Sequence, residues 1–526
     1  MINQHLGCCT TRTDMITKWK LGNFRSIRDY TELDFAPLTL FAGANSSGKS
    51  TILKSILLIA QTLSHKDHSR PLVLNGDLIK LKNFNDNISD NSRSKALVIG
   101  FECVPFSDTL LMFDQILKKK IDCEITVAPS DSETHLLSGN SGGIDLCRSH
   151  FGIGKHYSLN VTRSDIQTIS SKKRGLPADM DKDICNSLSY DVEDGESYVS
   201  PELGYSISPK AAKECKFTAI GCIVHNFLPL QIIIDVQYTE KDDDKNYFKY
   251  EKCPLEQEAK AATEYIRDFF SNSLHYLGPL RASPKSLHPR FSKSDKNSIN
   301  LKGENTAEVL ARHKGKIIRY IPSSSFVTSG NIPAPIECSL VGAVVDWLGY
   351  LGIAETIETV VKGKYLELGV KIGNSNKIND LTQVGVGVSQ VLPILVSGLL
   401  AESGTTLIFE QPELHLHPKV QSRLADFFLS MTQLGKQCLV ETHSEHIINR
   451  IRLRIAEGSV GSPWHEAAKM YFVENKNDSS TFREIKIDEC GSIPVWPEGF
   501  FDENESTVDK ITKAAFKKRE SNSRNN

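Results

Sequence analysis

The sequence lacks several features that would place it in a special class of protein. Its 12 cysteines include no C-x-x-C pair and no histidine at zinc-finger spacing, which argues against a disulfide framework and a structural zinc site. No apolar run approaches the roughly 18 residues that a membrane-spanning helix needs. The first residues, MINQHLGCCTTRTD, lack the apolar core of a signal peptide. We therefore expect a cytoplasmic chain with reduced thiols and no contact with a membrane.

An excess of charge of one sign and a long-range repeat are also missing. The 62 Lys and Arg residues nearly balance the 64 Asp and Glu residues, so the formal net charge of −2 does not point to a nucleic-acid-binding protein. No heptad repeat of useful length is present, which excludes a long coiled-coil arm. With 526 residues, 40% of them hydrophobic, the chain is long enough for two or three domains.

The strongest positive signal is a glycine-rich motif near the N-terminus. GANSSGKS at 43–50 satisfies G-x-x-x-x-G-K-[ST] between an apolar strand and an apolar helix. Backbone N–H groups of such a loop hold phosphates, so we expect Lys49 to contact the β- and γ-phosphates of ATP and Ser50 to bind Mg²⁺. The candidate nucleotide-binding residues are Asn45, Ser46, Ser47, Gly48, Lys49, Ser50 and Thr51.

The second half of a Mg-nucleotide site is expected in TTLIFEQPELHLHP at 405–418. This short apolar strand ends in a carboxylate, which makes Glu410 a candidate metal ligand beside Ser50. A later apolar strand exits into His443, which is placed to sense a γ-phosphate. His415 and His417 resemble metal ligands by composition, but no third ligand is near, and packing at a dimer interface is the preferred interpretation.

Composition shifts divide the chain into segments, with strand-like runs between polar stretches in the middle and helix–strand alternation at both ends. The predicted segments are an N-terminal extension (1–15), the N-terminal part of an α/β head (16–103), an inserted, largely β region (104–257), a helical connecting region with a basic loop (258–332), the C-terminal part of the head (333–475) and a C-terminal segment with a disordered tail (476–526).

Eight strings at both ends of the chain match one family: NFRSI, GANSSGKS, LNGDLIKLKNF, YLGPLR, VGVGVSQVLPIL, FEQPELHLHP, VETHSEHIINRIRLRIAEG and WPEGFFDE. Together they resemble the ABC-type ATPases of SMC, DNA-repair and OLD-like proteins, in particular a compact bacterial branch. The resemblance implies an α/β fold with an ABC-type P-loop ATPase head built from N- and C-terminal segments around an inserted, largely β middle region. It also implies ATP and Mg²⁺ as cofactors.

The same resemblance implies a head-to-tail homodimer, or a higher even-numbered oligomer, with ATP held between the P-loop and a signature motif. VGVGVSQ at 384–390 occupies the place of that signature, so Gly385, Gly387 and Ser389 are expected to approach the γ-phosphate bound by the other subunit. Ser389 can cap the helix that follows, with Pro393 in its first turn. Alternatively, the glycines form only a tight turn.

The residue after Glu410 differs from the wider ABC class, which has a glutamate there that activates water. This chain has Gln411, whose amide can orient water but cannot accept its proton. Either Glu413 supplies the base, with Gln411 and His443 beside it, or hydrolysis is slow and ATP mainly clamps the dimer. Candidates for a glutamine-loop contact are Gln61 and Asn83 or Phe84.

The resemblance extends to the ATPase subunits of Septu-like and retron-linked anti-phage defence systems. It therefore implies a separately encoded effector, with an HNH-type nuclease as one candidate. No nuclease domain is expected within the chain, because the Toprim-like string YFVEN at 471–475, with Glu474, is not followed by a D-x-D strand. Two alternatives stay open: a nucleotide-gated scaffold with little turnover that holds a toxic partner inactive, and a DNA repair or recombination ATPase.

DNA or RNA is a further candidate ligand, since roughly six phosphate contacts suffice for sequence-independent binding. The candidate contacts are Arg281, Lys285, Arg290, Lys293 and Lys296, with secondary clusters at Lys118–Lys120, Lys172–Arg174 and Lys517–Arg519. Charge runs of this kind are more often solvated faces.

Overall fold

A computed structural model describes residues 15–89, 94–105, 119–129, 144–154, 157–162, 187–190, 212–240, 246–289, 299–327, 334–373, 377–458, 464–497, 507 and 510–515. Most of the predicted N-terminal extension lies outside these ranges, and so does the predicted disordered tail, which begins at Ser521. In the described part of the chain, no helix is both long enough and apolar enough to cross a membrane.

The centre of the molecule is a six-stranded sheet in the order β12-β19-β20-β3-β21-β22, in which only β22 runs antiparallel. Its strands are β12 (Leu274–Leu277), β19 (Thr406–Glu410), β20 (Gln437–Thr442), β3 (Leu38–Gly43), β21 (Ala468–Lys476) and β22 (Ser479–Glu484). The N-terminal strand β3 lies between two strands from the C-terminal part. The predicted α/β head built from both ends of the chain is therefore confirmed.

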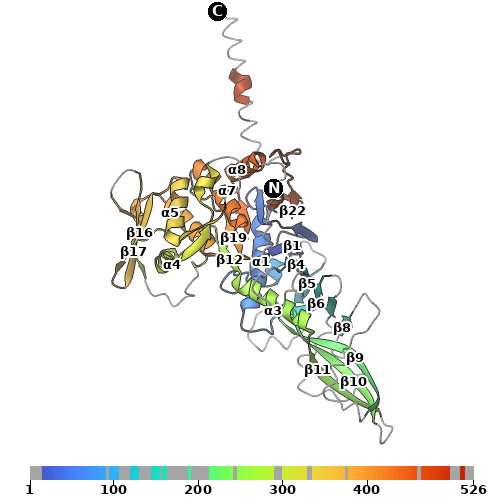
Figure 1. Ribbon diagram of the computed structural model, residues 1–526. Helices are drawn as coiled ribbons and strands as arrows, with labels where there is room; N and C mark the ends of the chain where they lie inside the picture. The colour runs from blue at the N-terminus through green and yellow to red at the C-terminus, as the bar shows by residue number, and fades with distance from the viewer. Residues whose placement is uncertain are drawn as a thin grey trace, which may run out of the picture.

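Side chains of the central strands alternate between the two faces of the sheet, and a hydrophobic core lies on each face. Leu38, Leu40 and Ala42 of β3 face one core, whereas Phe41 faces the other. The first core is covered by α4 (Thr306–His313), α5 (Leu340–Leu351), α6 (Gly387–Leu400), α7 (Pro418–Gln433) and α8 (Glu445–Glu457), and the second by α1 (Lys49–Ser64) and α3 (Gln257–Asn272) (Figure 1). Burial on both faces explains why β3, β19 and β20 carry apolar residues at consecutive positions.

A seven-stranded antiparallel sheet in the order β2-β1-β4-β5-β6-β7-β8 packs against the second core. Its strands are β1 (Met15–Gly22), β2 (Thr31–Asp34), β4 (Leu97–Val104), β5 (Ile121–Pro129), β6 (Ile144–Ile153), β7 (Tyr157–Thr162) and β8 (Ser187–Tyr190). Trp19 stacks on Phe101 and donates its indole N–H to Ser55 on α1 at 2.8 Å. Because β4 and β5 pair in one unbroken register, this sheet runs across the predicted boundary at 103/104.

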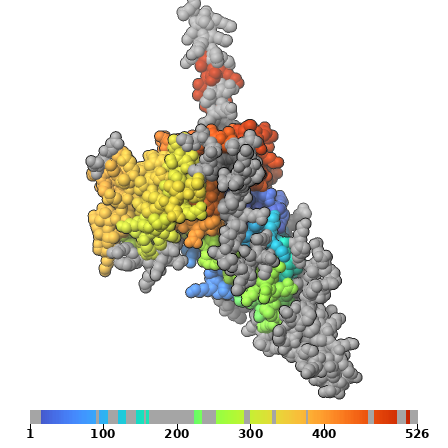
Figure 2. All heavy atoms as spheres, in the orientation of Figure 1, coloured from blue at the N-terminus to red at the C-terminus, as the bar shows by residue number. Residues whose placement is uncertain are grey.

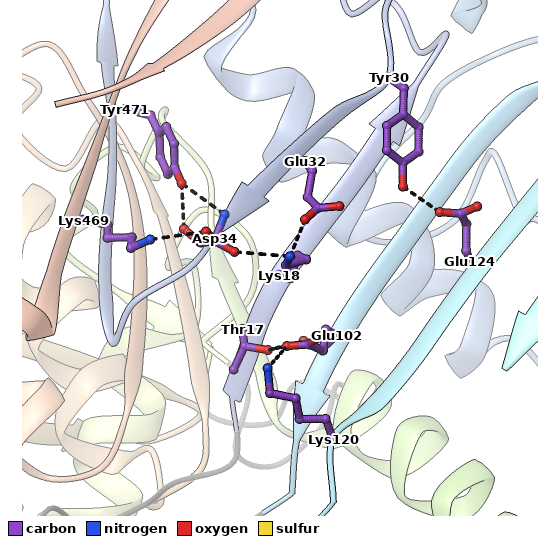
Figure 3. A network of polar contacts seen from close by, with 10 residues as sticks. All are labelled: Thr17, Lys18, Tyr30, Glu32, Asp34, Glu102, Lys120, Glu124, Lys469 and Tyr471. Atoms are coloured by element: carbon purple, nitrogen blue, oxygen red, sulfur yellow. Dashed lines mark hydrogen bonds and ion pairs between the residues drawn. The ribbon is translucent and has the colours of Figure 1, made fainter. Parts of the chain in front are cut away.

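Polar contacts near the surface join the seven-stranded sheet to the central sheet (Figure 3). The Tyr471 hydroxyl on β21 donates to the Asp34 carbonyl at 2.8 Å and accepts the Asp34 N–H at 3.1 Å. Lys469 lies 3.6 Å from the Asp34 carboxylate, which is 56% exposed. Exposed ion pairs contribute only about 0–1 kcal/mol, so the Tyr471 hydrogen bonds and the buried core stabilise this junction more than the ion pair does.

The remaining strands form three smaller sheets. They are the arm β9 (Ala212–His225), β10 (Leu228–Glu240) and β11 (Asn246–Pro254); the group β13 (His288–Pro289), β16 (Thr356–Lys362), β17 (Tyr365–Lys371) and β18 (Asn379–Asp380); and the pair β14 (Ile317–Tyr320) and β15 (Ile336–Ser339). Short helical turns are η1 (Asn85–Asn87), η4 (Ser323–Phe326), η5 (Leu381–Gln383) and α9 (Trp464–Ala467). The arm projects beyond α3 (Figure 1), and the lobe around α4 and α5 stands out to one side in yellow and orange (Figure 2).

The Toprim-like string YFVEN is a strand of the central sheet. It belongs to β21, whose Val473 lies opposite Gly43 of β3. Glu474 pairs with the Lys476 ammonium group. The hairpin from β21 to β22 carries this sheet past the predicted boundary at 475/476.

Candidate nucleotide-binding site

The loop between β3 and α1 has a backbone that requires glycine at two positions. Gly43 has a φ of 147° and Gly48 a φ of 101°. A Cβ at Gly43 would clash with the Val473 carbonyl oxygen, and one at Gly48 with the Ser480 hydroxyl. These glycines therefore allow the sharp turn that directs the loop into the N-terminus of α1, where free N–H groups can hold an anion.

Two segments that are distant in the sequence support this loop. The Ser480 hydroxyl donates to the Ser47 carbonyl at 2.6 Å, and the Ser480 N–H donates to the Ser26 carbonyl at 2.6 Å. The Ser26 hydroxyl lies 3.1 Å from the Thr51 hydroxyl. The string NFRSI thus forms a turn against the start of α1, and the hairpin strand β22 holds the other side of the loop.

Lys49 is buried beneath the loop, with 3% of its surface exposed. Its ammonium group donates to the Ala44 carbonyl at 2.6 Å and to the Gly43 carbonyl at 3.2 Å. Burial lowers the pKa of Lys49, whereas the carboxylates of Glu441 and Glu413 raise it. This cation is therefore held beside the loop and close to the acidic ends of β19 and β20.

Glu410 ends β19 and is 4% exposed. Its Oε1 accepts the Tyr276 hydroxyl at 3.1 Å. Burial, reinforced by the charge of Glu441, raises the pKa of Glu410 to about 7. A buried carboxylate whose pKa is raised by a neighbouring carboxylate favours a divalent cation beside the pair.

The three predicted catalytic residues lie together where the neighbouring strands β19 and β20 end. The Gln411 amide nitrogen is 3.3 Å from His443 Nε2, and Glu413 Oε1 accepts the His443 backbone N–H. Burial, with the charge of Lys49, lowers the pKa of His443 to about 4, so the ring is neutral near pH 7 and Nε2 can accept the amide N–H. Glu413 Oε2 is buried without a hydrogen-bond partner among the described residues.

One acid of this cluster, Glu441, is not singled out by the motifs. It is 2% exposed and lies opposite Glu410 in the parallel register of β19 and β20. Burial raises the pKa of Glu441, whereas hydrogen bonding from the Ser50 hydroxyl, the charge of Lys49 and the Gln411 amide lower it. Its signal in the sequence is an acid at the end of the apolar run QCLVE, which parallels LIFE at the end of β19.

The helix after the signature begins earlier than predicted. Helix α6 starts at Gly387 with Val386 as its N-cap residue, and the Ser389 hydroxyl donates back to the Val386 carbonyl at 2.7 Å. The predictions of Ser389 as the cap and Pro393 in the first turn are therefore wrong. Because Val386 already has helical dihedral angles, Ser389 is the third residue of the helix and Pro393 lies in the second turn.

The signature glycines are not required by the fold of one subunit. Neither Gly385 nor Gly387 has a positive φ. A Cβ at Gly385 would meet no described atom within 4 Å, and one at Gly387 would meet only Leu416, at 3.9 Å. A turn at these two positions therefore does not by itself require glycine.

Several other candidates have different roles. Gln61 donates its amide to the Val73 carbonyl and accepts the Ile79 N–H at 3.0 Å, so it holds α1 to the following segment and does not reach the loop. The Asn83 carbonyl accepts the side-chain amide of Asn87. His417 is the N-cap residue of α7, and its Nδ1 accepts the Lys419 N–H at 3.2 Å. No group of three or more His, Cys, Asp or Glu side chains in the described ranges forms a metal site of its own.

Of the candidate nucleic-acid contacts, Arg281 is excluded, because it is 8% exposed and donates to the Glu410 carbonyl at 3.3 Å. Lys119 and Lys120 form ion pairs with Glu258 and Glu102, each at 2.9 Å. Outside the described residues lie Lys118, Lys172–Arg174, Arg290, Lys293, Lys296 and Lys517–Arg519.

Solved structures similar to this chain include three SMC head domains. The SMC head bound to the C-winged helix domain of ScpA is 12% identical with a TM-score of 0.43, covering 90% of this chain and 98% of that one. The head from Thermotoga maritima is 10% identical with a TM-score of 0.36, covering 90% and 99%. A head with an extended coiled coil, bound to the C-terminal domain of ScpA derived from Pyrococcus furiosus, is 11% identical with a TM-score of 0.40, covering 95% and 100%.

Sequence comparisons give two short matches and one long match. The DNA replication and repair protein RecF of Acholeplasma laidlawii (strain PG-8A) is 44% identical over 52 residues, which is 10% of this chain and 15% of that protein. The chain thus matches only a small part of this curated relative. A family described as a protein of unknown function (DUF3696) matches residues 464–511. The family described as AAA ATPase domain matches residues 15–448. Because that match covers most of the chain and includes the P-loop, β19 and β20, this protein belongs to the AAA ATPase domain family.

Proposed function

We propose that this chain binds and hydrolyses ATP as an ABC-type ATPase, dimerises around Mg-ATP in the cytoplasm, and controls a separately encoded effector. The observation that carries the proposal is the meeting of Lys49, from the N-terminal part, with Glu413 and Glu441, from the C-terminal part. Glu410 lies opposite Glu441 in the neighbouring strand. The carboxylates of this cluster would repel a phosphate bound at the P-loop unless a cation lay between them.

The side chains present fit Mg²⁺ and ATP. The loop needs glycine at 43 and 48, and buried carboxylate oxygens of Glu413 and Glu441 have no hydrogen-bond partner among the described residues. Ser50 and Glu410 would hold Mg²⁺, which neutralises phosphate charge when bound. Lys49 and the N–H groups at the start of α1 would bind the phosphates.

The residues beside the acidic strand end divide the work of hydrolysis. Gln411 has a φ of 44°, which holds its side chain in an uncommon backbone conformation next to His443. Its amide can orient a water molecule, and the neutral His443 can hold the amide. Glu413 has one oxygen bound to the His443 backbone and one without a partner in the described chain, so it is the proposed proton acceptor.

Turnover distinguishes hydrolysis from a scaffold that only holds ATP. If Glu413 accepts the proton, Glu413→Gln lowers kcat by at least about 100-fold and changes the KM for ATP little. Gln411→Glu raises kcat, because it adds a carboxylate where the amide now stands. Both are measured as phosphate release from Mg-ATP by purified protein. Unchanged turnover in Glu413→Gln rejects this residue as the base, and no gain in Gln411→Glu argues against the scaffold alternative.

Dimerisation is tested at Gly385. Because a Cβ there meets no described atom of the same subunit, Gly385→Ala leaves the thermal unfolding midpoint of the nucleotide-free protein unchanged. If a second subunit brings its nucleotide against this backbone, the added methyl group weakens ATP-dependent dimerisation by about 10- to 100-fold, as overpacking does elsewhere. Sedimentation with and without ATP measures the effect.

Gly349→Ala is the matched control, because a Cβ at this exposed glycine of α5 also meets no described atom within 4 Å. It is expected to dimerise like the wild type. If Gly385→Ala also dimerises like the wild type, the signature does not face a second nucleotide.

The identity of the effector separates two candidate functions. Control of a nuclease in anti-phage defence is the first, and a DNA-repair ATPase is the second, which the short match to a RecF protein favours. Co-purification from cells followed by mass spectrometry discriminates them. A separately encoded nuclease in a stable complex supports the first function, and DNA-repair proteins without such a nuclease support the second.

A further inference from the structure

Glu441 lies at the centre of the site, on the strand between the P-loop strand and the strand that ends in Glu410. Its register partners are Glu410 on β19 and Phe41 on β3. A fully buried carboxylate is costly unless a cation or several donors balance it. Lys49 and Lys54 act on it through their charge, but no salt bridge of the described residues includes Glu441.

The hydrogen bonding of Glu441 differs from that of a structural buried acid. The Ser50 hydroxyl and the Gln411 amide lie near its carboxylate and lower the pKa of Glu441, yet Oε2 is buried without a hydrogen-bond partner in the described chain. Asp426 provides the contrast, because its Oδ1 accepts from Arg454 at 2.7 Å and its Oδ2 from Arg450 at 2.9 Å. Leaving a buried acceptor unpaired destabilises the folded protein, which a purely structural role would not explain.

The neighbours of Glu441 indicate what its free oxygen is for. Ser50 is the proposed Mg²⁺ ligand from the P-loop, and Glu410 is the proposed ligand from the adjacent strand. Glu441 is next to both, at the same edge of the sheet. Mg²⁺ in nucleotide sites is bound through one or two carboxylates together with phosphate oxygens and water.

We propose that Glu441 is a further Mg²⁺ ligand of this site, acting directly or through a metal-bound water, beside Ser50 and Glu410. The inference rests on the proposed function, since it assumes that Mg-ATP binds at the P-loop. Glu441 then gives the metal a second carboxylate, whereas Gln411 at the usual glutamate position contributes none.

The test measures metal-dependent binding, not turnover. Binding of a fluorescent ATP analogue is titrated in Mg²⁺ and in EDTA, for the wild type, Glu441→Gln and the control Glu358→Gln, which removes an exposed charge on β16. Glutamine keeps the shape of the side chain and an acceptor for Ser50. Glu441→Gln is expected to bind the ATP analogue about 10- to 100-fold more weakly than the wild type in Mg²⁺ and equally well in EDTA. Glu358→Gln is expected to match the wild type in both conditions.

A second variant keeps the test decisive if Glu441→Gln does not fold. Glu441→Asp retains the charge but moves the carboxylate away by one methylene group. It weakens binding in Mg²⁺, and Ca²⁺ restores part of the loss, because Ca²⁺ accepts ligands at 2.3–2.6 Å where Mg²⁺ requires about 2.0–2.1 Å. A response to both cations identical to that of the wild type would overturn the inference.

The outcomes separate this inference from the proposed function. If the wild type shows no saturable binding in either condition, the nucleotide site itself is absent. If the wild type binds and Mg²⁺ raises the affinity of Glu441→Gln as much as that of the wild type, only the metal role of Glu441 fails. If this variant then loses only turnover, Glu441 is a proton acceptor. If Glu441→Gln loses the same affinity in Mg²⁺ and in EDTA and also has a lower unfolding midpoint, Glu441 has a structural role and the inference is overturned.

Discussion

Lys49→Ala is expected to lower ATP turnover by about 100- to 1,000-fold and to weaken nucleotide binding in both Mg²⁺ and EDTA. The lysine is buried beside the loop backbone, and its charge is already close to Glu413 and Glu441. Alanine removes the buried cation that would neutralise the phosphates, and the loss of one preorganised donor has effects of this size. Phosphate release and equilibrium titration with a fluorescent ATP analogue measure the two changes.

Lys66→Ala is the matched control for this variant. Lys66 is an exposed lysine just beyond the other end of α1, so its loss changes the net charge by the same amount far from the loop. It is expected to bind and hydrolyse ATP like the wild type. Wild-type binding by Lys49→Ala would show that nucleotide does not occupy the P-loop.

A second large effect is expected in the interior, where Asp426 holds three elements together. Asp426 on α7 is 0% exposed and accepts hydrogen bonds from Arg454 and Arg450 of α8. It also accepts the Tyr350 hydroxyl of α5 at 2.6 Å. Arg423 lies over the Tyr350 ring, with 4.7 Å from its Cζ to the ring centroid.

Asp426→Asn is expected to lower the free energy of unfolding of the α5–α7–α8 unit by about 3–5 kcal/mol. The substitution keeps the volume of the side chain but leaves the Arg450 and Arg454 charges partly buried without their carboxylate. Chemical denaturation followed by circular dichroism measures the change. Glu32→Ala removes a surface ion pair with Lys18 and should change stability by less than about 1 kcal/mol. A loss of less than 1 kcal/mol in Asp426→Asn would contradict the assigned role of the network.

Local chemistry made much of the site predictable. Gly43, Gly48, Lys49 and Ser50 lie within one turn and the start of one helix, so their spacing alone specifies a phosphate-binding loop. Glu410 could be predicted for the same reason. In a chain with a phosphate-binding loop, an apolar run that ends in an acid is typical of the strand that supplies the metal ligand. The fold class followed from the order of strand, loop and helix at one end and strand and helix alternation at the other.

Arg281 shows where this kind of argument fails. It begins a basic stretch, which by composition is typical of a solvated or nucleic-acid-binding surface. In the fold, β12 pairs with β19 just before it, and this pairing brings Arg281 under the Glu410 carbonyl. Burial depends on a partner strand that lies far away in the sequence, and no local pattern encodes that partner.

The amino-acid sequence by itself was enough to predict the phosphate loop, the acid that ends β19, and that both belong to one α/β head. Each of these features depends on contiguous residues and on apolar periodicity. Only the tertiary structure decided that β20 lies between β19 and β3, and so brought Glu441 to Ser50 and Glu410. Strand order results from packing among distant segments, and the two apolar faces of these strands are compatible with more than one neighbour. The contacts of Glu441 could therefore be found only once the sheet was formed.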